Sequence, residues 1–199
     1  MSQARIVWNS NNLDFPDNFV SYWEAKLKAR RTGETPSDGG IHGIQLSSLW
    51  FEGFLQSKNF TDSTIEAALW AWFAWAVQGK QYAIARDLTK MYSANITAIL
   101  GSGATAATVA STAGPTAGDD IYFKSLTSPD IHKARISSLG GGVTINFVGY
   151  PSKYTFASGS LVRHVDYLPK VVSLDSEFPV REENSLSWTL EHRFREDAA

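Results

Sequence analysis

The stretch from Ser63 to Asp87 constrains the fold of this chain more than any other part of the sequence. Its apolar residues recur at helical spacing, which predicts an amphipathic helix over residues 63–78. Ser63 and Glu66 have the spacing of a capping box at the start of a helix. Gly79 stands where a helix end favours a residue that tolerates positive φ. We therefore expect one helix here, followed directly by a strand.

This helix carries more apolar side chains than one face can hold. We expect six of them to serve helix packing or a subunit interface, namely Ile65, Leu69, Trp70, Trp72, Phe73 and Trp75. A helix that is apolar nearly all round must be covered on two sides, by its own sheet and by a loop or a neighbouring subunit. We interpret its tryptophans as packing residues and not as a ligand platform, because indoles at helical spacing mostly fill space.

The same helix is not predicted to cross a membrane. Its uninterrupted apolar run, Ala67–Val77, is well short of the roughly 20 residues that a transmembrane helix needs. The first ten residues also lack the apolar core of a secretory signal, so we expect synthesis in a cytoplasm and no membrane anchor.

Composition indicates a folded protein with few charges. Of its 199 residues 43% are hydrophobic and only 19% are charged, which suits a subunit that has partners. A net charge of −2 argues against a broad nucleic-acid-binding face, so no sequence-specific nucleic acid is expected. We interpret the basic cluster of Lys26, Lys28, Arg30 and Arg31 as the solvated side of a strand. The chain has no cysteine and therefore no disulfide.

β-prone segments lie on both sides of the helix. Residues from Trp23 onward alternate as a strand with one wet face, and Ile41–Leu55 is a long β-prone run, so the two should form a long hairpin around the loop Thr32–Gly40. A strand over Gln81–Asp87 follows the helix. Later segments with strand character are 121–123, 134–137, 143–148, 154–156, 161–165, 171–174 and 185–194, with a turn at 140–142.

This order predicts a mainly β fold of the α+β class. The simplest architecture is one domain over residues 1–199, an antiparallel β-sandwich or small barrel with one flanking helix and a long hairpin. Residues 95–118 are nearly all small and could be an arm, an insertion or a poorly packed hairpin. We expect the loop 32–40 and the segment 101–118 to be ordered mainly by other subunits, because neither has much apolar surface to bury.

The most tempting chemical motif is Gly101-Ser102-Gly103-Ala104-Thr105-Ala106, which matches a dinucleotide-binding fingerprint. That fingerprint needs a helix to receive the pyrophosphate. Here Thr108, Val109 and Gly114-Pro115 make the following stretch a poor helix. We therefore expect no cofactor.

No other residue pattern indicates catalysis or metal binding. The histidines lie far apart and outside any metal-binding spacing, at His42, His132, His164 and His192. No G-x-S-x-G nucleophile elbow is present. The adjacent acids Asp119-Asp120 and Glu182-Glu183 would point apart in a strand, which does not suit shared acid–base work. The sequence thus predicts a protein that is not an enzyme.

Several features stand in an order found in one class of viral proteins. They are Trp8, Leu13-Asp14-Phe15, the basic strand with its hairpin partner, Leu69-x-x-Trp72-x-x-Trp75-Ala76-x-x-Gly79, a strand ending in Asp87, and Trp188-Thr189-Leu190-Glu191. Together they resemble the tail structural proteins of long-tailed bacteriophages, in particular the distal tail and baseplate proteins that cap the tail tube. The resemblance covers roughly the first ninety residues and the last strand.

The resemblance implies a virion structural protein with a tube-like β-sandwich. Such a protein would assemble in the host cytoplasm as an oligomeric ring, contact other tail proteins at the tail tip, and let the genome pass through its lumen. A lumen for DNA should be lined by neutral or acidic residues, because basic ones would hold the phosphates. The candidate acids are Asp119, Asp120, Glu182 and Glu183.

Two other functions remain open from the sequence. The first is a carbohydrate-binding β-sandwich module, in which exposed rings of Tyr150, Tyr154 and Phe156 would stack on sugars. The second and weaker one is a hydrolase whose scattered acids are brought together only by the fold. Oligomeric state and glycan binding separate these readings from a ring subunit.

Overall fold

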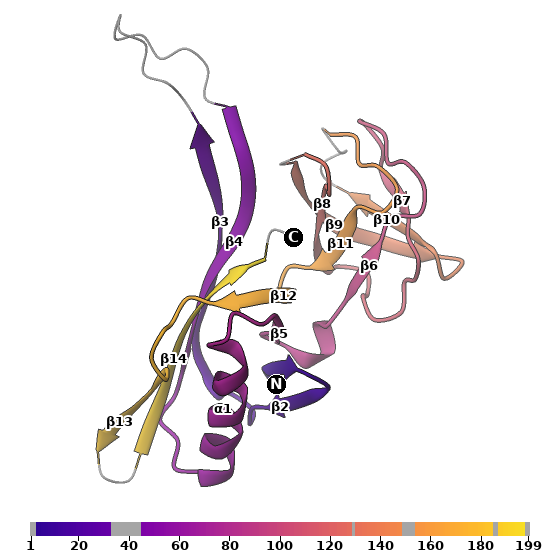
Figure 1. The fold of residues 1–199 in the computed structure, drawn as a ribbon. Helices are drawn as coiled ribbons and strands as arrows, with labels where there is room; N and C mark the ends of the chain where they lie inside the picture. The colour runs from indigo at the N-terminus through magenta and orange to yellow at the C-terminus, as the bar shows by residue number, and fades with distance from the viewer. Residues whose placement is uncertain (1–2, 33–44, 129, 149–153, 185–186, 198–199) are drawn as a thin grey trace, which may run out of the picture.

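The computed structural model describes residues 3–32, 45–128, 130–148, 154–184 and 187–197, although not every side chain at the edges of these ranges. Within them the chain forms two antiparallel sheets and one α-helix (Figure 1). The predicted mainly β fold with one flanking helix is confirmed.

The first sheet has eight strands and is built from the beginning and the end of the chain. Its strand order is β2-β1-β5-β12-β14-β4-β3, and β13 pairs with β14. The strands are β1 (Arg5–Trp8), β2 (Asn11–Asp14), β3 (Val20–Thr32), β4 (Gln45–Ser57), β5 (Tyr82–Ala85), β12 (Tyr167–Ser173), β13 (Val180–Asn184) and β14 (Ser187–Glu196). The C-terminal strand β14 therefore lies between β12 and β4, in the interior of the sheet.

The helix α1 (Ser63–Ala76) packs on this sheet and contributes to its core. Its N-cap is Asp62, whose carboxylate accepts the N–H of Thr64 at 2.8 Å. The predicted capping box is therefore wrong: Ser63 is already helical, and the cap lies one residue earlier, where an ionised carboxylate accepts the orphan amide. The helix also ends two residues before the predicted boundary. Gly79 has a φ of +71°, and its N–H donates to the carbonyl oxygen of Ala76, as predicted for the helix end.

Strands β3 and β4 pair from one end to the other and project away from the body of the protein (Figure 1). Near the base of this hairpin the ring of Trp23 packs against Phe194, with ring centroids 5.4 Å apart. Leu27 is 45% exposed, so the predicted dry side of β3 is wrong at this residue: Tyr122 and Arg163 cover Phe51, its partner on β4, but not Leu27 itself. The predicted tip lies outside the described residues.

The second sheet has six strands in the order β6-β11-β8-β9-β10-β7. The strands are β6 (Ser93–Asn95), β7 (Ala106–Thr108), β8 (Asp120–Lys124), β9 (Ile131–Gly140), β10 (Thr144–Val148) and β11 (Leu161–His164), and a short 3₁₀ helix, η1 (Leu88–Lys90), precedes them. A bridge between Ile96 and Val109 joins the segments that follow the two edge strands, so the sheet curls into a nearly closed barrel. Its interior is filled by a separate core that includes Ile121, Phe123, Ile145, Phe147 and Phe156.

The small-residue segment is part of this barrel. The N–H of Thr97 donates to the carbonyl oxygen of Thr108, the N–H of Ala110 donates to that of Asn95, and both bonds measure 2.9 Å. Ala107 and Val109 are buried. The expectation that residues 101–118 depend on other subunits for order is therefore wrong, because backbone hydrogen bonds within the chain hold the segment. The turn predicted at 140–142 is confirmed by positive φ at Gly141 and Gly142.

Candidate functional site

The helix residues singled out in the sequence divide into buried and exposed groups. Ile65, Leu69, Trp72 and Phe73 are buried in the core beneath the first sheet. Trp75 is half-buried, and its indole Nε1 donates to the carbonyl oxygen of Gln81 at 3.2 Å. These five side chains pack against other parts of the same chain, so they are not available to a subunit interface.

Trp70 belongs to the opposite side of the helix. Its side chain is 52% exposed, and its ring stacks on Phe178 with centroids 3.5 Å apart. The exposed residues around it are apolar too, and we call this surface the open helix face: Ala67, Trp70, Ala71, Ala74 and Val77. Glu66 is the only charged residue in α1, so this face lacks the charges that normally cover a solvent-facing helix.

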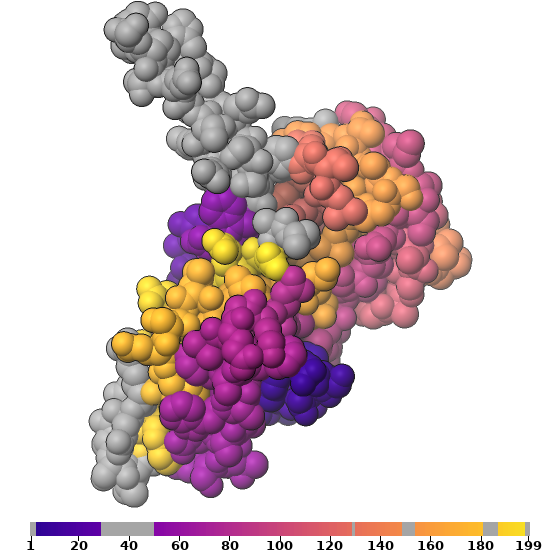
Figure 2. All heavy atoms as spheres, viewed as in Figure 1, coloured from indigo at the N-terminus to yellow at the C-terminus, as the bar shows by residue number. Residues whose placement is uncertain are grey.

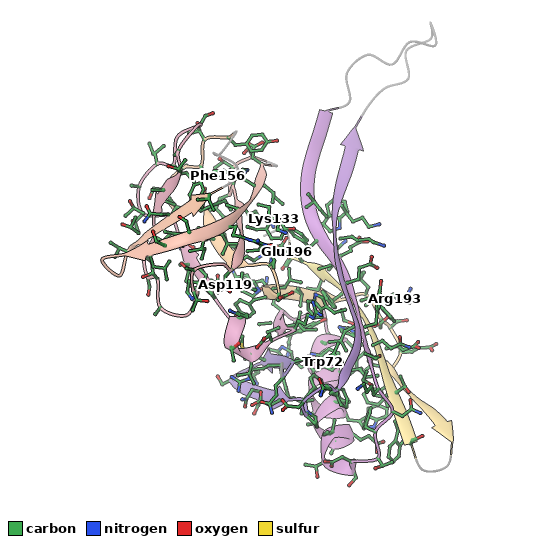
Figure 3. All side chains as sticks on the ribbon, turned by 180° about the vertical axis from the view of Figure 1, so that it is seen from behind. Trp72, Asp119, Lys133, Phe156, Arg193 and Glu196 are labelled. Atoms are coloured by element: carbon green, nitrogen blue, oxygen red, sulfur yellow. The ribbon has the colours of Figure 1, made fainter. Side chains whose placement is uncertain are left out.

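A polar network of three side chains lies under the helix, in the core of the first sheet. His192 is fully buried, with Nδ1 2.8 Å from Asp175 Oδ2 and Nε2 2.5 Å from the phenol oxygen of Tyr82. The indole of Trp72 meets the imidazole edge-on at a centroid distance of 4.6 Å (Figure 3 labels Trp72).

The protonation of this network follows from its burial. Burial lowers the pKa of His192 despite the opposing effect of Asp175, so the imidazole is neutral at neutral pH. Burial also raises the pKa of Tyr82 well above its usual value. The phenol therefore keeps its proton and donates to Nε2, while the Nδ1–H donates to the Asp175 carboxylate. The arrangement has the order of a catalytic relay, but Tyr82 is only 2% exposed and no substrate can reach it.

A second set of buried charges joins the two sheets. Glu196, at the end of β14, forms an ion pair with Lys124 of β8, in which Oε2 lies 2.9 Å from the lysine Nζ. Its other oxygen, Oε1, lies 3.7 Å from Nε of Arg163 in β11. The guanidinium of Arg163 lies over the rings of Phe51 and Tyr122, one from each sheet. We call Lys124, Arg163 and Glu196 the junction cluster.

Arg163 is only partly satisfied in this position. Its Nη1 donates to the carbonyl oxygens of Tyr167 at 2.9 Å and His164 at 3.2 Å, but Nε and Nη2 have no hydrogen-bond partner among the described residues. Burial lowers the pKa of Arg163, and Glu196 opposes the shift. A guanidinium stays protonated even so, which makes it a permanent buried charge.

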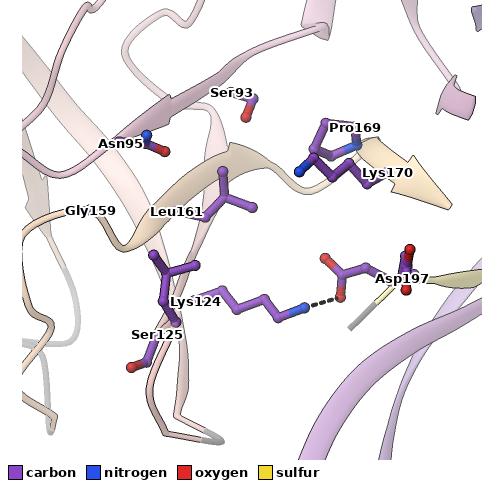
Figure 4. Close-up of a pocket in the computed structure, with 11 residues that line it drawn as sticks. Ser93, Asn95, Lys124, Ser125, Gly159, Leu161, Pro169, Lys170 and Asp197 are labelled. Carbon is purple, nitrogen blue, oxygen red and sulfur yellow. Dashed lines mark ion pairs between the residues drawn. The ribbon is translucent and has the colours of Figure 1, made fainter. Parts of the chain in front are cut away.

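A pocket of about 450 Å³ opens beside the junction cluster (Figure 4). Both sheets contribute to this junction pocket. Its lining residues are Ser93, Asn95, Lys124, Ser125, Leu126, Gly159, Leu161, Pro169, Lys170, Glu196 and Asp197. No motif in the sequence points to it, because its walls come from five separated segments that only the fold brings together.

The acids considered for a lumen are neutralised where the structure describes them. Asp119 Oδ1 is 2.6 Å from Lys90 Nζ, and Asp120 is held by Lys133 at 2.9 Å and Arg135 at 2.8 Å. The bond from Arg135 is the main reason that the pKa of Asp120 is lowered. The side chains of Glu182 and Glu183 lie outside the described part of the chain.

The other motifs do not converge on a site. Among the described residues no group of three His, Asp or Glu side chains could hold a metal ion. His132 and His164 are buried at separate places in the second sheet, and His42 lies outside the described residues. The turn at 101–103 leads into strand β7 and not into a helix.

The predicted sugar platform is wrong in one of its three rings. Phe156 is fully buried in the barrel core and forms only a bridge with Leu100, not the predicted strand. Tyr154 is 41% exposed and meets the ring of Phe156 edge-on. Tyr150 lies outside the described residues.

No model of a known protein family matches the chain, and no curated protein sequence matches it. Within the described residues, no helix has both the length and the apolar character needed to cross a membrane.

Proposed function

We propose that this chain is a structural subunit of the tail tip of a long-tailed bacteriophage. In this proposal it assembles in the host cytoplasm into an oligomeric ring that caps or extends the tail tube, joins other tail proteins and has no catalytic activity. The observation that carries the proposal is the open helix face, where Trp70 and Val77 are about half exposed on a helix whose one charged residue is Glu66. Exposed apolar patches of this kind mark interaction surfaces.

The division of the chain into two sheets also supports the proposal. The resemblance to tail proteins rests on roughly the first ninety residues and on residues 188–191, and these segments belong to the first sheet and its helix. The barrel, over residues 93–164, falls where the resemblance stops. Figure 2 shows helix α1 at the surface of the molecule, in the same view as Figure 1.

Charge supports the same function. The chain has a net charge of −2, and Asp119 and Asp120 are each paired with cations. Lys90, Lys133 and Arg135 outnumber these two acids by one, so the support comes from the small net charge of the whole chain, which would not hold a polyanion strongly.

Native mass spectrometry of the intact chain tests the proposal. We expect a closed oligomer, because a repeated head-to-tail interface closes into a ring when the rotation allows it. Trp70→Glu should shift the population to monomers, since it places a charge in an apolar contact. Ile99→Glu is the matched control, because Ile99 is 72% exposed on the barrel and outside the open helix face.

Two results would contradict the proposal. One is a wild-type chain that stays monomeric at high concentration and joins no tail complex. The other is a ring that Trp70→Glu and Ile99→Glu leave equally intact, which would remove the open helix face as its interface.

A further inference from the structure

The junction pocket has unused hydrogen-bonding groups along one wall. Ser93 and Asn95 project from the edge strand β6, whose backbone pairs with β11 (Figure 4). Neither side chain makes a hydrogen bond to any described residue. Ser125, by contrast, already accepts two backbone N–H groups, from Thr127 and Ser128. The pocket therefore offers a hydroxyl and an amide to a ligand without breaking an existing bond.

The charges around the pocket leave one cation in excess. Lys124, Lys170, Glu196 and Asp197 line the pocket, and the buried Arg163 lies behind Glu196 as the third cation. Glu196 is shared by Lys124 and Arg163. Asp197 accepts the side-chain amide of Gln81. Lys170 has no ion-pair partner among the described residues.

The remaining wall is apolar but not aromatic. Leu126, Leu161 and Pro169 line it. Such a wall suits the C–H groups of a small ring or chain. The volume of about 450 Å³ lies in the range of small-molecule sites.

From these three features we infer that the junction pocket binds a small hydroxylated carboxylic acid, of the size and chemistry of a sugar acid. Lys170 pairs with the ligand carboxylate, Ser93 and Asn95 bond its hydroxyls, and the apolar wall contacts its carbon skeleton. A neutral sugar lacks the partner for Lys170, and a simple carboxylate lacks the hydroxyls. This site does not depend on the proposed role in a phage tail.

Calorimetric titration of the full chain tests the inference with three probes: glucuronate, glucose and acetate. Glucuronate should bind about tenfold more tightly than glucose or acetate, since only it uses both the ammonium and the polar wall. Lys170→Met should reduce glucuronate affinity about tenfold and leave glucose unchanged. Asn95→Ala should weaken glucuronate and glucose by a similar factor. Lys58→Met, at an exposed lysine outside the pocket, is the control and should change nothing.

Because Lys170 and Asn95 are exposed, both variants should fold, which circular dichroism checks. Absence of saturable glucuronate binding up to tens of millimolar would overturn the inference. Equal affinity for glucuronate and glucose, or an unchanged affinity in Lys170→Met, would overturn it as well. Amide shifts in an NMR titration should be confined to the neighbourhood of Ser93, Leu161 and Lys170, and shifts elsewhere would count against the site.

Discussion

The carboxylate of Glu196 lies 2.9 Å from the ammonium of Lys124 and connects the last strand of the first sheet to the barrel. Both residues belong to sheets with separate hydrophobic cores, so this pair and the neighbouring Arg163 hold the two cores together. Aromatic contact reinforces the joint, because the rings of Phe51 and Tyr122 lie 4.9 Å apart beside it.

Glu196→Gln should strongly destabilise the chain. Removing one partner of a buried pair leaves Arg163 charged and uncompensated, which costs about 3–5 kcal/mol. Urea denaturation followed by tryptophan fluorescence measures the loss. Glu24→Gln, at an exposed ion pair on the hairpin, is the control and should leave the midpoint unchanged. A Glu196→Gln midpoint equal to that of the control would show that the junction cluster contributes nothing.

Trp72→Ala should cost about 3–5 kcal/mol of stability, because the indole is fully buried and its loss leaves a large cavity. Trp70→Ala, two positions away on the same helix, is the matched control. Its ring is 52% exposed, so the expected loss is below about 1.5 kcal/mol. Chemical denaturation of both variants measures the difference. A larger loss for Trp70→Ala than for Trp72→Ala would mean that the helix packs through the other face.

Stability should fall as the pH is lowered below about 6.5, the usual pKa of histidine. Burial lowers the pKa values of His192 and His164 in the folded chain, so in this range the unfolded state binds protons that the folded state does not. His192→Gln should flatten this dependence. Denaturation at a series of pH values between about 5 and 7.5 measures the slope.

The carboxylates titrate at lower pH than the histidines, so they do not contribute to this slope. The pKa of Asp175 is lowered in the folded chain, since its bonds to His192 and Arg193 outweigh burial. Its contribution is present above the unfolded pKa of about 3.9 and is lost only at lower pH. His164→Gln should remove the other part of the slope. A slope that survives both substitutions would contradict the assignment.

Gly53→Ala should destabilise the base of the hairpin. A Cβ at position 53 would meet the ring of Phe194 at 2.3 Å and the carbonyl oxygen of Glu24 at 2.7 Å, and the carbonyl cannot move without breaking the pairing of β3 with β4. Overpacking of this kind costs about 1–3 kcal/mol. Gly101→Ala is the control, because a Cβ there meets nothing within 4 Å. Thermal unfolding compares them, and equal melting temperatures would be the contrary result.

The sequence by itself determined the helix and the glycine at its end, but it grouped the exposed Trp70 with the residues that the helix buries. It also determined the hairpin and the turn at 140–142. Each of these is recorded in a run of neighbouring residues, because helical and strand periodicities are local consequences of backbone geometry. The choice of Asp62 over Ser63 as N-cap was not determined in this way, since both residues can cap and their order in the chain favours neither.

Only the tertiary structure decided which segments meet. It placed β14 between β12 and β4, enclosed residues 95–118 in a barrel, and brought Glu196 to Lys124 and Arg163. A strand's alternation tells which side chains share a face but not which strand lies beside it. The junction pocket depends on that choice of neighbours, so its residues carry no common pattern along the chain. Strand order is settled by the total burial and pairing of the whole chain, which no single segment contains.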